Sequence, residues 1–217
     1  MVWYAWGSCA KLLNIEDGNR MGGEDNTVIE NSDGALTATH FTGPRKRLVA
    51  FGFDFLLIFA YVLILLGIGI AITVTIGPLD QIHPVFASPV FMDLVAFLIL
   101  VLPVILYFTL QESSSRKATW GKRKAGIQVV NTGGTRLTRK QALVRSVLKF
   151  LPWQIAHSSI FHIEGFPLEP AEPTPLVISG LVLVWVLLGI YAISMLVSKK
   201  HRTPYDWAAG AYVVITK

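Results

Sequence analysis

The longest apolar stretch of the chain is LVAFGFDFLLIFAYVLILLGIGIAITVTI, residues 48–76, in which Asp54 is the only charged residue. A helix needs about 20 apolar residues to cross a hydrocarbon core about 30 Å thick. This stretch is longer than that, so it can cross with tilt or extend into the interface. Gly77-Pro78 marks its end. Residues 48–76 therefore predict a transmembrane helix, and the rest of the chain is interpreted around it.

The composition agrees with a membrane protein. Hydrophobic residues make up 53% of the 217 residues and charged residues 15%, whereas a soluble domain carries about 25% charged residues. A disordered chain is excluded, and a soluble enzyme is disfavoured. The single cysteine excludes a disulfide framework and a cysteine-based metal site. A net charge of +5 in so apolar a chain is more typical of anchoring at a membrane surface than of nucleic-acid binding.

Three further segments are candidates for membrane insertion. Residues 90–110 and 176–197 are apolar and predict two more transmembrane helices. Residues 141–163 are amphipathic up to Pro152 and apolar after it. This weaker segment is either a crossing helix, an interfacial helix or a re-entrant segment.

The distribution of Lys and Arg favours four crossings. These residues fall up to Arg47, between 109 and 149, and after Val197, and none lies in 77–92 or 150–176. With four passes all nineteen lie on one side, and both termini are cytoplasmic; with three passes the last four fall outside. We therefore expect an integral, multi-pass protein of the plasma (inner) membrane.

The domain organisation is simple. Residues 1–43 are polar and are expected to form a disordered tail, with Met1 and Met21 both plausible starts. Residues 44–217 form the transmembrane domain. Residues 126–130 and 211–215 are short β-branched runs beside glycine, and we expect them to pair. The predicted fold is an all-α membrane protein with four membrane segments plus a small cytoplasmic two-strand ribbon.

Three local patterns stand out: RLVAFGFD at 47–54, TWGK followed by AGIQVV over 119–130, and YDWAAGAYVV at 205–214. Together they resemble the RDD family of membrane proteins, which is named for one arginine and two aspartates. The resemblance assigns the charged trio to Arg47, Asp54 and Asp206. Family members often have His where Tyr205 stands and Gly-Thr at 210–211. The supporting positions of the resemblance are Thr119, Gly121, Lys122, Gly126, Arg145 and Gly210.

The residues themselves suggest how the trio is paired. Asp54 lies about 10 Å further along a helix than Arg47, so we expect each to find a partner on another element. We expect Arg47 to pair with Asp206. Asp54 could meet Arg145, Lys149 or a histidine. A carboxylate at this depth either binds a proton or cation or fixes helix packing.

Two functions are carried forward. The resemblance implies transport of an undefined ligand or, for some members, sodium–proton exchange. If the chain is a transporter or exchanger, we expect Asp54 to bind the cation or proton and Arg47 with Asp206 to form a cytoplasmic gate or latch. The alternative is a non-transporting scaffold or assembly protein whose charged trio is structural. No nucleophile–base pattern predicts an enzyme. His157 and His162 are five residues apart, which is poor spacing for a metal site. The expected partners are anionic headgroups at the cytoplasmic face and a second copy of the chain, with no cofactor and no nucleic acid.

Overall fold

The computed structural model describes residues 29–30, 36–37, 41–77, 88–166 and 170–216. Most of the predicted tail over 1–43, with both candidate start residues, lies outside the described residues. Within it, β1 (Ile29–Glu30) and β2 (Leu36–Thr37) form a short antiparallel pair.

Three helices in the described part of the chain are long and apolar enough to cross a membrane. They confirm the helices predicted over 48–76, 90–110 and 176–197. The first begins at a proline in its first turn, where a missing N–H is harmless. The second is one rod with a π-helical turn in its middle. The bounds are α1 (Pro44–Ile76), then α3 (Pro89–Ala96), η3 (Phe97–Val101) and α4 (Leu102–Glu112), and finally α7 (Pro175–Val197).

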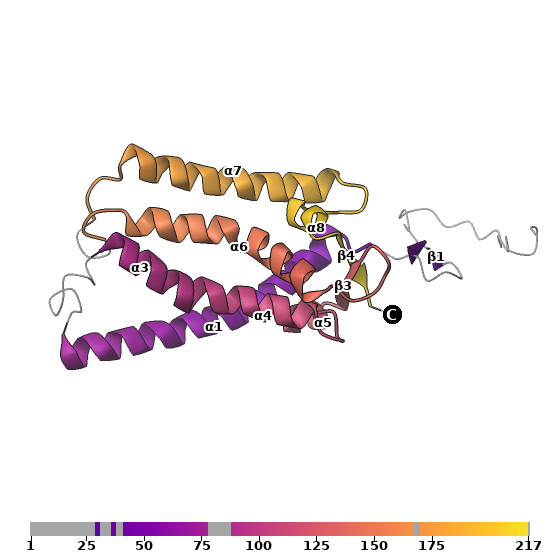
Figure 1. The fold of residues 1–217 in the computed structure, drawn as a ribbon, viewed down its shortest axis with the longest axis horizontal. Helices are drawn as coiled ribbons and strands as arrows, with labels where there is room; N and C mark the ends of the chain where they lie inside the picture. The colour runs from indigo at the N-terminus through magenta and orange to yellow at the C-terminus, as the bar shows by residue number, and fades with distance from the viewer. Residues whose placement is uncertain (1–28, 31–35, 38–40, 78–87, 167–169, 217) are drawn as a thin grey trace, which may run out of the picture.

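A fourth long helix, α6 (Arg139–Phe161), follows the weakest predicted segment. It begins at a capping box in which Thr138 and Gln141 bond each other's backbone N–H. Its 23 residues correspond to about 34 Å. Figure 1 shows α6 running alongside α7 and the second rod.

Helix α6 continues through Pro152 because a neighbouring helix satisfies the group that proline leaves unpaired. A proline inside a helix removes the hydrogen bond to the carbonyl four residues earlier, which is that of Leu148. The hydroxyl of Tyr191 on α7 donates to this carbonyl at 2.6 Å. The proline thus becomes a contact between α6 and α7.

Pro103 in the second rod is accommodated in the same way. It follows the π-helical turn η3, and the carbonyl four residues earlier belongs to Ile99. The hydroxyl of Tyr61 on α1 donates to that carbonyl at 2.5 Å. Both prolines therefore offer a carbonyl to a tyrosine of another helix.

One end of the bundle carries a small mixed structure, here called the cap (Figure 1). Its two strands pair antiparallel with Val129 opposite Val213, which confirms the predicted ribbon. Their buried side chains pack on Ala50 of α1 and Ala142 of α6, which supports a ribbon that would be marginal alone. The cap consists of α5 (Trp120–Lys124), β3 (Ile127–Asn131), α8 (Pro204–Ala208) and β4 (Ala211–Ile215).

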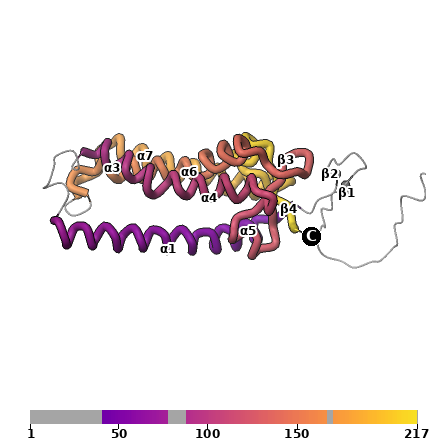
Figure 2. The backbone as a smooth tube through the Cα atoms, turned by 60° about the horizontal axis from the view of Figure 1, so that its bottom comes forward, coloured from indigo at the N-terminus to yellow at the C-terminus, as the bar shows by residue number. Residues whose placement is uncertain are grey.

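Helix α1 lies apart from the layer formed by the other long helices over much of its length (Figure 2). Its most extensive contacts with the cap are made with α5 and β3, and Arg47 also binds Asp206 of α8. Most of its apolar side chains are exposed, and Ala50 and Asp54 are its buried residues. Helix α1 thus packs on the rest of the protein mainly through its N-terminal part.

Candidate functional site

A cluster of ionisable side chains lies where the long helices meet the cap. Its members come from α1, α4, α5, α6 and α8, so it joins segments that are far apart in the sequence. The charged cluster consists of Arg47, Asp54, Glu112, Lys122, Arg145, Lys149 and Asp206.

Asp206 is the acceptor at the centre of one half of the cluster. It is fully buried in the first turn of α8, and its Oδ2 accepts a hydrogen bond from Arg47 Nη1 at 2.8 Å. Its Oδ1 accepts one from Arg145 Nε at 2.8 Å, and Thr203 N–H donates to Oδ2 at 3.2 Å. Burial acts to raise the pKa of Asp206, but Arg145 and Arg47 outweigh it and hold that pKa well below its ordinary value. The predicted contact between Arg47 and Asp206 is confirmed, with Arg145 as an additional partner.

Glu112 extends this network, although the sequence analysis does not predict it as a site residue. It is the last residue of α4, fully buried, and bonds both Arg145 Nη1 at 2.5 Å and Lys122 Nζ. Burial lowers the pKa of Lys122, and Glu112 only partly offsets this. The sequence held a signal, because Glu112 is the one carboxylate between Asp93 and Glu164 in a stretch with ten basic residues.

Asp54 forms a separate half of the cluster. Its buried carboxylate accepts hydrogen bonds from Thr119 Oγ1 at 2.6 Å, Gly121 N–H at 2.8 Å and Tyr107 Oη at 3.2 Å. All three partners donate, as befits an acceptor-only carboxylate. The expectation that Asp54 bonds Arg145, Lys149 or a histidine is wrong for the described residues.

The two histidines lie away from Asp54 for a simple reason. His157 Nδ1 contacts the Trp153 carbonyl at 2.8 Å, and His162 Nδ1 contacts the Ser158 carbonyl at 2.7 Å, both on their own helix. Both residues belong to the last part of α6 or follow it, whereas Asp54 lies against the cap. Between these two histidines in the sequence, the hydroxyl of Ser158 on α6 donates to Asp93 Oδ1 of α3 at 2.9 Å.

The predicted glycines have distinct structural roles. A Cβ on Gly121 would lie 2.2 Å from the Ala50 carbonyl oxygen and 2.8 Å from Asp54 Cγ, so only glycine lets α5 approach α1 so closely. Gly126 and Gly210 precede β3 and β4 with φ of 65° and 60°, a conformation that favours glycine. Thr119 caps α5, with its Oγ1 accepting from Lys122 N–H while donating to Asp54.

Lys149 is the cluster member whose charge is least compensated. Its Nζ lies 3.7 Å from the ring centroid of Phe108 and 5.1 Å from that of Phe150. Among the described residues it makes no hydrogen bond or ion pair. A desolvated cation–π contact is worth about 2 kcal/mol or more, whereas burying an ammonium group costs several kcal/mol, and no carboxylate among the described residues pairs with Lys149 to offset that cost.

A cavity of about 290 Å³ lies beside the cluster. Four basic side chains and one carboxylate are among its described lining residues, and apolar side chains of α1, α6 and α7 form much of its wall. The charged lining residues are Arg47, Asp54, Lys122, Arg145 and Lys149. In the part of the chain that the structure describes, no group of three or more His, Cys, Asp or Glu could hold a metal ion.

The residues of the sequence-predicted site therefore form two separate sets of hydrogen bonds. Arg47 and Asp206 bind each other, with Arg145 as a bridge to Glu112, whereas Asp54 binds the segment around Thr119 and Gly121. Each contact holds a different part of the cap against the helices.

Comparison with known families gives one result. A model of the RDD family matches residues 41–210. No match was found among curated proteins or among solved structures.

Proposed function

Since the chain belongs to the RDD family, we propose that it is a four-pass plasma-membrane protein that acts as a membrane scaffold. In this proposal its charged trio is the internal lock of the cytoplasmic end. The observation that carries the proposal is the set of hydrogen bonds that the Asp54 carboxylate accepts. Three protein donors occupy this carboxylate, so it already acts as a structural acceptor and has little capacity left for an ion.

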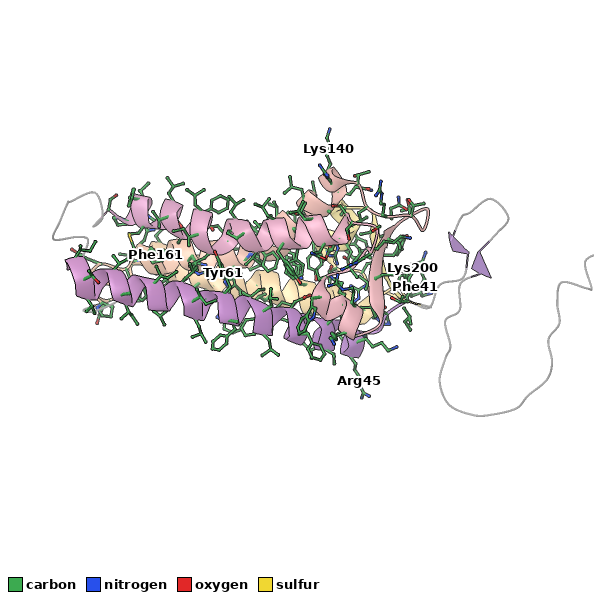
Figure 3. All side chains as sticks on the ribbon, turned by 90° about the horizontal axis from the view of Figure 1, so that it is seen from below. Phe41, Arg45, Tyr61, Lys140, Phe161 and Lys200 are labelled. Atoms are coloured by element: carbon green, nitrogen blue, oxygen red, sulfur yellow. The ribbon has the colours of Figure 1, made fainter. Side chains whose placement is uncertain are left out.

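The arrangement of α6 supports four passes. It lies between the second rod and α7 in Figure 1, and its two ends lie near opposite ends of the bundle. The exposed basic residues Arg45, Lys140 and Lys200 all lie at the cap end, whereas Phe161 lies toward the other end (Figure 3). In the described residues from 150 to 166 and 170 to 176 there is no Lys or Arg. The positive-inside rule then assigns the cap to the cytoplasm.

A reporter fused after Pro173 tests this topology. We expect a periplasmic-type reporter to be active there and a cytoplasmic-type reporter to be silent, because α6 would have carried that point across the membrane. A fusion after Gly134, in the β3–α6 loop, is the control and should give the opposite pattern. Cytoplasmic signals at both points would contradict the four-pass arrangement.

Transport is the second candidate, and two ionisable groups favour it. Lys149 lines the cavity without a carboxylate partner among the described residues, and Asp93 lies in an apolar helix. Together with Asp54 these groups could move a proton or an ion. In that case the contact between Arg47 and Asp206 would act as a gate.

Cation-driven proton flux in everted vesicles separates the two candidates. We expect wild-type flux no higher than that of empty vesicles for sodium, potassium and lithium, because Asp54 is held by three donors. Asp54→Asn and Asp93→Asn vesicles, at matched protein abundance, should give the same background. Wild-type flux that disappears in a folded Asp54→Asn variant would replace the scaffold with an exchanger.

A further inference from the structure

The cavity beside the charged cluster has an excess of positive charge. Arg47, Lys122, Arg145 and Lys149 face it, and Asp54 is the carboxylate among its described lining residues. The carboxylates Glu112 and Asp206 are not among its described lining residues and already bind three of these cations. The seven cluster members thus comprise four cations and three carboxylates, which leaves one positive charge unmatched.

Unused hydrogen-bond donors accompany this charge. The Nε and Nη2 atoms of Arg47 are buried and make no hydrogen bond with the described residues. Lys149 Nζ contacts aromatic rings and, among the same residues, has no acceptor. Buried donors without acceptors are uncommon in native proteins. Guanidinium and ammonium groups with free donors select an anion with several oxygens, such as a phosphate.

The wall of the cavity indicates an anion that carries hydrocarbon. Leu48, Phe51 and Trp153 line it and are 70%, 40% and 49% exposed, so the cavity reaches the outer surface of the helices. That surface continues along α1, which lies apart from the neighbouring layer (Figure 2). A volume of about 290 Å³ is at the lower end for ligand pockets, which suits a headgroup whose chains remain outside.

The depth of the cavity fits a headgroup as well. On α1, the exposed basic residues Arg45 and Lys46 are followed, after Arg47, by the exposed apolar residues Leu48 and Val49. This change marks the boundary between headgroups and hydrocarbon. Arg47, which lines the cavity, lies at that boundary.

We propose that the cavity binds one anionic phospholipid, with its phosphate held by Arg47 and Lys149 and its acyl chains lying against the apolar faces of α1, α6 and α7. This inference rests on the membrane placement proposed above and goes beyond it, because it assigns a single lipid to a defined site. General attraction of the basic loops to an anionic surface would not need Lys149.

Lipid binding to the purified full-length protein in detergent tests the proposal, with native mass spectrometry as the readout. The probes are dioleoyl phosphatidylglycerol and dioleoyl phosphatidylcholine. We expect one phosphatidylglycerol per protein, bound at least about tenfold more tightly than phosphatidylcholine. Equal affinity for the two lipids would overturn the proposal whatever the variants do.

A matched pair of lysine variants locates the site. Lys149→Met should lose about tenfold in phosphatidylglycerol affinity, and its fold should persist because no hydrogen bond or ion pair to a described residue is removed. Lys140→Met removes an exposed lysine at the same end of the bundle, outside the described lining, and should change the affinity by less than about twofold. Equal losses in both variants would indicate surface attraction only and would contradict the proposal.

Inorganic phosphate distinguishes a lipid from a free anion. We expect millimolar phosphate to displace phosphatidylglycerol poorly, since the acyl chains add apolar contacts. Displacement by phosphate at the concentration of the lipid itself would overturn the lipid assignment. The reporter after Pro173 is read in cells, so a failure of the topology is distinguishable from a failure of lipid binding.

Discussion

Replacing Asp206 by Asn is expected to lower the free energy of unfolding by about 3–5 kcal/mol, the range for breaking a buried ion pair. Asp206 is the shared acceptor of Arg47 and Arg145, and both cations would lose a buried counter-charge. Unfolding in mixed micelles, followed by circular dichroism, measures the effect. Glu172→Gln, an exposed carboxylate outside the cluster, is the control and should change the free energy by less than about 0.5 kcal/mol.

The difference in unfolding free energy between wild type and Asp206→Asn should depend on pH. The folded-state pKa of Asp206 is lowered by Arg145 and Arg47 against the opposing effect of burial. Its contribution to stability is therefore fully present above the unfolded pKa of about 3.9 and is lost as the pH falls toward the folded value. The difference between wild type and Asp206→Asn should stay constant from pH 7 to 5 and shrink below about pH 4. A difference that shrinks already between pH 7 and 6 would contradict this assignment.

Replacing Gly121 by Ala is expected to lower the free energy of unfolding by about 3 kcal/mol, from overpacking and from a weakened buried hydrogen bond. The added Cβ would lie 2.2 Å from the Ala50 carbonyl oxygen and 2.7 Å from Asp54 N. Both are backbone atoms, so relief requires α5 to move away from α1. The Gly121 N–H then leaves the Asp54 carboxylate. The same unfolding assay measures the loss.

Gly52→Ala on α1 is the matched control for this substitution. A Cβ at Gly52 has no described atom within 4 Å, and alanine is the better helix former by up to about 1 kcal/mol. Its stability should therefore equal or exceed that of wild type. Equal losses for Gly52→Ala and Gly121→Ala would show that the close approach of α5 does not matter.

Most of the helical framework could be predicted from local sequence, because apolar length is a one-dimensional property. The spans over 48–76, 90–110 and 176–197 each fall within an observed helix of membrane-crossing length. The segment over 141–163 was ambiguous since Pro152 indicates a break. Its continuity depends on Tyr191, which lies 43 positions away from the Leu148 carbonyl it satisfies. No local pattern contains that pairing.

The site was predictable in its members more than in its contacts. Asp206 binds Arg47 and Arg145, as attraction between opposite charges predicts. Thr119 and Gly121 come from one short motif of the sequence, so it is no surprise that they lie together. The charge pattern predicts a cationic or histidine partner for Asp54, yet two hydroxyl groups and a backbone N–H donate to its carboxylate. Such neutral donors have no signature in a charge pattern. Glu112 could have been found by asking which carboxylate offsets the basic loop.

The central claim is that Asp54 fastens the cap to the first span, and hydrogen exchange with mass spectrometry tests it most directly. Asn at position 54 would present an NH2 group to donors that need an acceptor, so Asp54→Asn should speed amide exchange over residues 119–131 by at least about tenfold. Exchange in α7 should stay unchanged. Asp93→Asn, a carboxylate bonded to Gln154 and Ser158 away from the cap, should leave residues 119–131 as in wild type. Unaltered exchange over 119–131 in a folded Asp54→Asn variant would contradict the lock and return Asp54 to the candidates for an ion-binding group.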